Sequence, residues 1–139
     1  MWPNGFEKYG TSNSLTGKKI NLEFVSANPT GPIHLGHTRW AAVGDSLGRV
    51  LSAAGAQVSR EFYVNDRGNQ MDLFGQSLRA AALGIDRPEN GYHGEYIADL
   101  ASEITKVNPE FTKLDEESGM VAFREAGYKL QLDLQREVL

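Results

Sequence analysis

The sequence predicts an α/β fold in which a parallel sheet comes first and a mostly helical segment follows. Two apolar, strand-like runs, 19–26 and 57–64, are each followed by a longer pattern with helical periodicity. No strand signal follows residue 64. The order strand, helix, strand, helix favours parallel strands joined by right-handed crossovers, because a parallel pair needs a helix-length connection.

The first part of the chain carries the predicted strands. Residues 1–17 are rich in Gly, Ser, Thr and Asn and are expected to form a flexible lead-in. Residues 18–83 form the first half of the sheet domain, with strands at 19–26 and 57–64 and helices at 35–54 and 69–83. Gly55 is a suitable stop for the first helix. The apolar positions predict these core residues: Val43, Leu47, Val50, Leu51, Ala54, Val58, Phe62, Val64, Met71, Leu73, Phe74, Leu78 and Ala82.

Residues 84–139 are expected to be a mostly helical insertion or connective segment. It comprises a loop at 84–94, a helix at 95–107 and, after the break at Asn108-Pro109, one or two helices in 114–139. Its predicted core positions are Ile97, Leu100, Ala101, Ile104, Val121, Phe123, Leu130, Leu134 and Val138. Two strands do not complete a doubly wound sheet, which usually has about five or six. We therefore expect a fragment of a larger protein, whose residues 84–139 hide their apolar faces by pairing with another copy.

Composition excludes several classes of function. The net charge of -4 argues against a general nucleic-acid binder, and the absence of cysteine excludes disulfides, thiolate catalysis and cysteine-ligated zinc. No apolar run approaches the ~20 residues of a membrane-spanning helix, and the first residues lack the pattern of a signal peptide. A cytoplasmic location is the expectation.

The most informative stretch is the turn 27–37, Ala-Asn-Pro-Thr-Gly-Pro-Ile-His-Leu-Gly-His, between the first strand and the first helix. A strand, a rigid turn and a helix N-terminus together suit a phosphate chain. The imidazoles of His34 and His37 suit contacts to phosphate while negative charge builds on it, and Gly36 allows a ligand to approach the backbone. The alternative is a histidine pair that only caps or packs. A metal site is not expected, because only Asp45 is available as a third ligand.

Three further side chains near this turn are candidates for binding. Glu23 lies in a strand that otherwise reads as buried, so it is either an outward-facing acid or a carboxylate waiting for a cation such as a guanidinium. Asn28 is either a turn residue or a group that holds a substrate's amino or carboxylate end, with help from Ser26.

The end of the second strand carries a second polar segment, 63–70. Ligands of open α/β sheets bind beyond the carboxyl ends of the strands, so Asp66 and Gln70 are expected to share a crevice with the 26–37 segment. The alternative is that Asp66 is only the N-cap of the following helix. The loop 91–96 reads as surface structure, although Tyr92 and Tyr96 could stack on a base.

The run from Glu23 to His37 strongly resembles the signature of bacterial arginyl-tRNA synthetases. Its His34-Leu35-Gly36-His37 resembles their version of the class I synthetase motif, usually written H-I-G-H. The resemblance continues through 41–45, 61–70 and 90–97, and the last of these looks like the insertion of one bacterial branch. A lone H-x-G-H would be shared with other nucleotidyl transferases, whereas the long run with its later blocks is specific.

This resemblance implies a Rossmann-like class I catalytic domain, of which the chain holds the N-terminal part. It implies activation of arginine by ATP, with Mg²⁺ accompanying the nucleotide, and transfer of arginine to tRNA(Arg). His34 and His37 are then the catalytic pair, and they bind ATP together with Gly36. Glu23 faces the guanidinium of arginine, while Ser26, Asn28 and His34 hold its amino and carboxylate end.

Other parts of the family pattern are absent from this chain. The lysine-rich K-M-S-K-S-like loop, the later strands and the tRNA-binding domains are missing, so the isolated chain is expected to be inactive or very weak and to self-associate. The alternatives are a small H-x-G-H adenylyltransferase and a non-catalytic binding module. Sequence beyond Leu139 would distinguish the three.

Overall fold

The computed structural model describes residues 9–139, and the chain divides into two compact units. Within the described residues, the strand unit consists of residues 9–27 and 34–63, and the helical unit of residues 28–33 and 64–139. The predicted lead-in at 1–17 therefore lies partly outside the described residues. Each unit has its own packing and is described separately.

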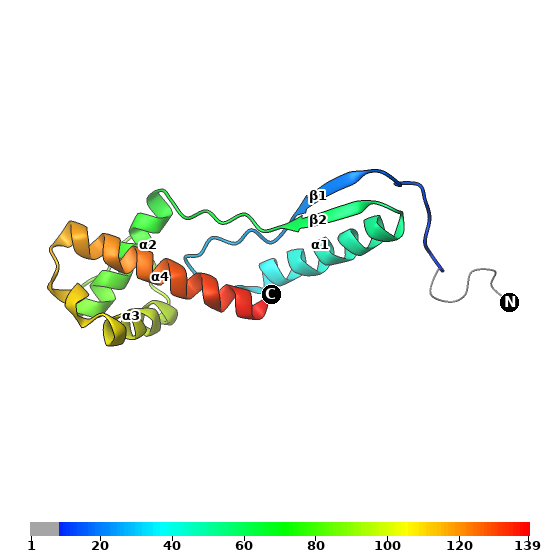
Figure 1. Ribbon diagram of the computed structural model, residues 1–139. Coiled ribbons are helices and arrows are strands. Elements are labelled where there is room, and N and C mark those ends of the chain that lie inside the picture. The colour runs from blue at the N-terminus through cyan, green and yellow to red at the C-terminus, as the bar shows by residue number, and fades with distance from the viewer. Residues whose placement is uncertain (1–8) are drawn as a thin grey trace. The chain divides into compact units, whose positions relative to one another are not determined.

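The strand unit is a two-stranded parallel sheet with one helix against it (Figure 1). Strand β1 spans Lys19–Glu23, helix α1 Leu35–Ala53 and strand β2 Gln57–Glu61. The register runs from the pair Lys19 and Gln57 to the pair Glu23 and Glu61. Parallel pairing by a helical crossover confirms the predicted α/β arrangement. It also brings the carboxyl ends of the two strands together.

Both strands are shorter than predicted. The predicted first strand continued to Ser26, but β1 ends at Glu23 because Val25 and Ser26 take positive φ angles of 69° and 43°. Such angles turn the backbone away from the extended conformation. The second strand was predicted to reach Val64, but β2 ends at Glu61.

Helix α1 contacts the sheet through glycines. Gly44 and Gly48 are its buried residues, and a Cβ at Gly44 would collide with the ring of Phe24. The predicted core face was therefore wrong for three of its members: Val43, Leu47 and Val50 are exposed by 51%, 44% and 64%. With Trp40, exposed by 61%, they form an apolar stripe at spacings of three, four and three residues. A glycine surface lets helix and sheet approach closely, and the large side chains lie on the neighbouring, exposed face of the helix.

The end of α1 follows the prediction. Gly55 has a φ of 98°, and the N–H groups of Gly55 and Ala56 donate to the carbonyls of Ser52 and Leu51. This pair of bonds is the Schellman motif, which accounts for a glycine at this position. Residues before β1 are held to the same helix end, since the Ser12 N–H donates to the Ala53 carbonyl at 2.8 Å. This part of the expected lead-in is thus bound to the fold.

The helical unit packs three α-helices and a short 3₁₀ helix around one core (Figure 1). Its elements are α2 (Asn69–Leu83), α3 (Glu95–Val107), the 3₁₀ helix η2 (Pro109–Lys113) and α4 (Glu116–Val138). The buried core cluster comprises Met71, Phe74, Leu78, Ile97, Leu100, Ala101, Ile104 and Phe123. The apolar faces of α3 and α4 that we expected to pair with a second copy thus find a partner in α2. In packing, α2 belongs with residues 84–139, whereas the sequence placed it with the strands.

Helix α4 is a single helix whose buried face differs from the predicted one. Its buried residues include a row at intervals of four: Gly119, Phe123, Gly127, Gln131 and Gln135. Of the predicted core positions, Phe123 is buried, whereas Leu134 and Val138 are exposed by 44% and 69%. Rows of residues four apart are the ridges along which helices pack. Asp72 of α2 and Arg124 of α4 add an ion pair of 2.6 Å across the same interface. None of the described helices is both long enough and apolar enough to cross a membrane.

Candidate active site

A tight bend at the end of β1 begins the candidate site. The Ser26 N–H donates to the Phe24 carbonyl at 3.0 Å, which closes a short turn around Val25. Val25 is a β-branched residue at a φ of 69°, a conformation that costs of order 1–3 kcal/mol. Strained backbone of this kind persists only where the surrounding fold holds it in place, and it is found most often at functional sites. The bend redirects the chain immediately after Glu23.

The hydroxyl of Ser26 joins both strand ends. It donates to Oε1 of Glu23 at 2.7 Å and accepts the N–H of Tyr63, which follows β2, at 3.0 Å. A hydrogen bond from a hydroxyl to a carboxylate is charge-assisted and orients the acid. Glu23 also stands beside Glu61 in the strand register, so like charges meet at this end of the sheet. A bound cation would relieve that repulsion.

The two histidines form the start of α1. His34 is the N-cap, and its Nδ1 accepts the N–H of Gly36 at 3.1 Å, while Nδ1 of His37 accepts the N–H of His34 at 3.3 Å. The rings stack with centroids 3.8 Å apart and planes 24° from parallel. Because Nδ1 is an acceptor in both rings, each neutral ring carries its proton on Nε2. The pair therefore caps the helix, which was the alternative prediction for these histidines. It also retains two Nε2–H donors beside the helix N-terminus.

Burial and the neighbouring His34 lower the pKa of His37 below its usual 6.5. The neutral form keeps the Nδ1 acceptor that the cap requires. Neutral imidazoles that donate from Nε2 at a helix N-terminus can hold a phosphate oxygen as negative charge develops. Gly36 serves this geometry directly: a Cβ there would lie 2.9 Å from Cε1 of His34, so glycine lets the ring fold over the backbone.

The turn between the bend and the helix belongs to the helical unit. Asn28 donates from Nδ2 to Oε1 of Gln70 at 2.7 Å, which brings together two of the residues predicted from the sequence. Asp66 instead lies 3.8 Å from its exposed neighbour Arg67. The alternative prediction, that Asp66 is the N-cap of α2, was wrong. The N-cap is Gly68, and no side chain caps this helix end.

Two residues that hold this turn were missed. Gln135 of α4 donates from Nε2 to the carbonyls of Asn28 and Gly31, at 3.1 and 2.8 Å, and the Tyr96 hydroxyl of α3 donates to the Thr30 carbonyl at 2.9 Å. Burial raises the pKa of Tyr96 to about 12, with a further contribution from Tyr92 and opposition from Arg87. Tyr92 makes a T-shaped contact with Phe74, and both tyrosines are partly buried against the core, so neither ring is an open surface for a base. The buried row of α4 carries two glutamines, Gln131 and Gln135, and only the tertiary contacts distinguish them.

Comparison with known proteins identifies the family. The model of the class I tRNA synthetase (R) catalytic domain matches residues 6–137. The chain belongs to this arginyl-tRNA synthetase family. The matched range includes the run from Glu23 to His37.

Curated relatives of this synthetase segment are much longer. The chain is 52% identical over 132 residues to an arginine–tRNA ligase of Renibacterium salmoninarum. The match covers 95% of the chain and 24% of that protein. It is 49% identical over 125 residues to one of Pseudarthrobacter chlorophenolicus, covering 90% of the chain and 23% of that protein. The chain therefore spans about a quarter of the relatives that it matches.

A solved structure supports the class I fold of the segment. A Campylobacter jejuni crystal structure described as an arginyl-tRNA synthetase is similar, with a TM-score of 0.77 and 35% identity, over 94% of this chain and 30% of the other. The two-stranded parallel sheet and the helices that follow are thus part of a synthetase catalytic domain.

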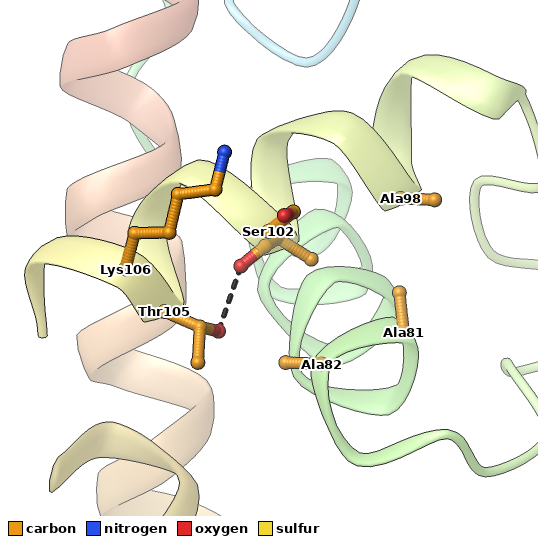
Figure 2. A pocket seen from close by; sticks show the side chains of 7 residues that line it. Ala81, Ala82, Ala98, Ser102, Thr105 and Lys106 are labelled. Carbon is orange, nitrogen blue, oxygen red and sulfur yellow. Dashed lines mark hydrogen bonds between the residues drawn. The ribbon is translucent and has the colours of Figure 1, made fainter. Parts of the chain in front are cut away.

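Two cavities lie within the helical unit of the synthetase segment. One of about 390 Å³ lies between α2 and α3 and is lined mainly by small side chains (Figure 2). There the Thr105 hydroxyl bonds its own helix, at the Ala101 carbonyl, so it offers little chemistry. Another of about 360 Å³ is lined by residues that include Pro32, Tyr96 and Gln135. Within residues 9–139, no group of three or more His, Asp or Glu side chains is placed to hold a metal ion.

Proposed function

We propose that this chain is the N-terminal part of the catalytic domain of a cytoplasmic arginine–tRNA ligase. The parent enzyme activates arginine with ATP and transfers it to tRNA(Arg) during protein synthesis. The observation that carries the proposal is the stacked pair His34 and His37 at the start of α1, which keeps two Nε2–H donors beside a helix N-terminus. The match of residues 6–137 to the synthetase family supports this reaction.

In the first step, a carboxylate oxygen of arginine attacks the α-phosphorus of ATP. A new P–O bond forms, the bond to pyrophosphate breaks, and the products are arginyl-adenylate and pyrophosphate. The Nε2–H groups of His34 and His37 stabilise the charge that grows on the phosphate oxygens. Mg²⁺ enters with the triphosphate, whose oxygens it prefers as ligands. A ribose hydroxyl at the tRNA 3′ end then attacks the activated carbonyl and releases AMP.

We infer that the groups at the strand ends recognise the guanidinium of arginine, and that Asn28 of the helical unit contacts the amino end of the substrate. The Glu23 carboxylate, held by the Ser26 hydroxyl, offers a guanidinium the bidentate acceptor that it prefers. The register neighbour Glu61 adds negative charge at the same end of the sheet. Asn28 gives its amide N–H to Gln70, which leaves Oδ1 for the ammonium group of the substrate.

A hybrid enzyme tests the function. Residues 6–137 would replace the matching part of the Renibacterium salmoninarum ligase, and arginine-dependent ATP–pyrophosphate exchange would be measured. We expect Glu23→Gln to raise the KM for arginine about 10- to 100-fold and to change the KM for ATP little, since a charged hydrogen bond contributes ~1.5–3 kcal/mol. Glu89→Gln, an exposed acid in a loop, is the control. An unchanged KM for arginine would remove Glu23 from the site.

We also propose that the isolated chain is nearly inactive and associates with itself. Catalysis needs segments that the relatives have beyond the quarter matched here. Exchange by the 139-residue chain should stay near background, and turnover close to that of a complete ligase would refute this. Self-association would use the exposed stripe of Trp40, Val43, Leu47 and Val50, whose spacing suits a helix–helix seam.

A further inference from the structure

The turn at residues 28–31 is held by side chains from three helices of the helical unit. Gln70 of α2 accepts from the Asn28 amide, Tyr96 of α3 donates to the Thr30 carbonyl, and Gln135 of α4 donates to two carbonyls. Pro29 is fully buried and Thr30 is 6% exposed. The middle of the turn is therefore buried while Asn28 remains exposed, although the turn belongs to no helix or strand.

Gln135 makes two of the four hydrogen bonds that hold this turn. It lies 104 and 107 residues from Gly31 and Asn28 in sequence, and its single NH₂ group serves both carbonyls. Pro29 and Pro32 have no N–H, so this turn has few backbone donors of its own. A carbonyl left without a donor in this part-buried turn would be destabilising, because it loses contact with water and gains no partner.

The orientation of the Gln135 amide is defined by these bonds. The side chain is 2% exposed, and its Oε1 has no hydrogen-bond partner in the structure. Reversing the amide would place Oε1 against two carbonyl oxygens, which is worse than leaving it unpaired.

We propose that Gln135 is a positioning residue that fixes the backbone of the 28–31 turn and thereby the side chain of Asn28. Its action on arginine binding rests on the proposed function. Its action on the turn does not, because the contacts lie entirely within the helical unit. Helix α4 thus contributes to the signature turn from the far end of the chain.

Variants of Gln135 in the full 139-residue chain test this inference. Gln135→Leu keeps the size of the side chain and removes both donors. Backbone ¹⁵N order parameters of Thr30 and Gly31 should fall from about 0.85, typical of rigid backbone, to below about 0.6. Gln131→Leu is the matched control, because Gln131 is 3% exposed one turn earlier in α4 and makes no hydrogen bond to the turn. Unchanged order parameters in Gln135→Leu would overturn the proposal.

Gln135→Glu gives a second, independent readout if Gln135→Leu does not fold. A protonated carboxyl can still donate one hydrogen bond, whereas an ionised one would face two carbonyl oxygens. Burial and the acids Asp99 and Glu137, which line the same cavity, disfavour the ionised form of the introduced group. The turn should be ordered at low pH and loosen as the pH rises. Order independent of pH, as in wild type, would count against the proposal.

The KM for arginine in the hybrid ligase tests the role of Gln135 separately from the proposed function of the chain. In the hybrid ligase, Gln135→Leu should raise the KM for arginine at least fivefold, while Gln131→Leu should leave it near wild type. A loosened turn with unchanged arginine KM would refute the link through Asn28. A wild-type hybrid that does not use arginine would refute the proposed function, and the order parameters would still decide the role of Gln135.

Discussion

The hydroxyl of Ser26 donates to the Glu23 carboxylate at 2.7 Å and accepts the Tyr63 N–H at 3.0 Å. One oxygen thus orients the acid and joins the ends of the two strands. The bend that brings Ser26 to this position requires a positive φ at Val25, so the contact and the strain belong together.

Ser26→Ala should lower the free energy of unfolding by about 1 kcal/mol, because it removes two hydrogen bonds of the strand unit. Urea denaturation measures this change. Ser12→Ala is the control, since the Ser12 hydroxyl bonds only the exposed Ser14 and its loss should have little effect. Equal stability of the two variants would show that the Ser26 bonds contribute nothing beyond a surface contact.

The pKa of His37 should be measurable by NMR titration below its usual 6.5, with burial as the larger cause and His34 as the smaller. A lowered pKa means that folding favours the neutral ring. His37 therefore stabilises the fold above about pH 6.5, and this contribution is lost as the pH falls through the lowered pKa. His34→Asn keeps a good N-cap but removes the neighbouring imidazole, so the His37 pKa should rise only part of the way. A midpoint at or above 6.5 in the wild type would contradict the capped arrangement.

Gly44→Ala should destabilise the protein by about 1–3 kcal/mol, because the new Cβ would collide with the ring of Phe24. Gly48→Ala is the matched control on the same buried face. Its Cβ would meet the guanidinium of Arg60 at 2.9 Å, and this flexible side chain can move away. Alanine also favours a helix over glycine by ~1 kcal/mol, so Gly48→Ala should be neutral or stabilising. Equal melting temperatures of Gly44→Ala and Gly48→Ala in thermal denaturation would argue against close packing of Gly44 on Phe24.

Leu47→Lys should reduce self-association of the isolated chain, because it places a charge in the exposed apolar stripe of α1. Ser46→Lys adds the same charge at the adjacent exposed position and should not affect it. Sedimentation velocity at several concentrations measures the difference. A wild-type chain that remains monomeric at high concentration would refute the seam on α1.

Local signals in the sequence predicted the elements of the helical unit well. The predicted bounds of α2 and α3, 69–83 and 95–107, are those observed. Gly84, with a φ of 66°, ends α2, and all four apolar positions predicted for α3 are buried. Helix ends depend on residues within one turn of them, and so the sequence contains the necessary information.

Which face of a helix is buried was predicted less well. In α1 the apolar positions implied a core face, but the sheet approaches Gly44 and Gly48 instead. In α4, Gln131 and Gln135 are buried while Leu134 and Val138 are exposed. Apolar periodicity predicts that one face of a helix is more apolar than the other. Which face is buried depends on the elements that pack against the helix.

The sequence by itself determined the order of the elements, the H-x-G-H turn and the family of the chain, because these reside in contiguous residues. Only the tertiary structure decided how that turn is held. The bonds of Gln135 to Asn28 and Gly31 span more than a hundred residues, and Ser26 meets Tyr63 only because parallel pairing brings the strand ends together. Such contacts depend on packing between distant segments, and no local pattern in the sequence encodes them.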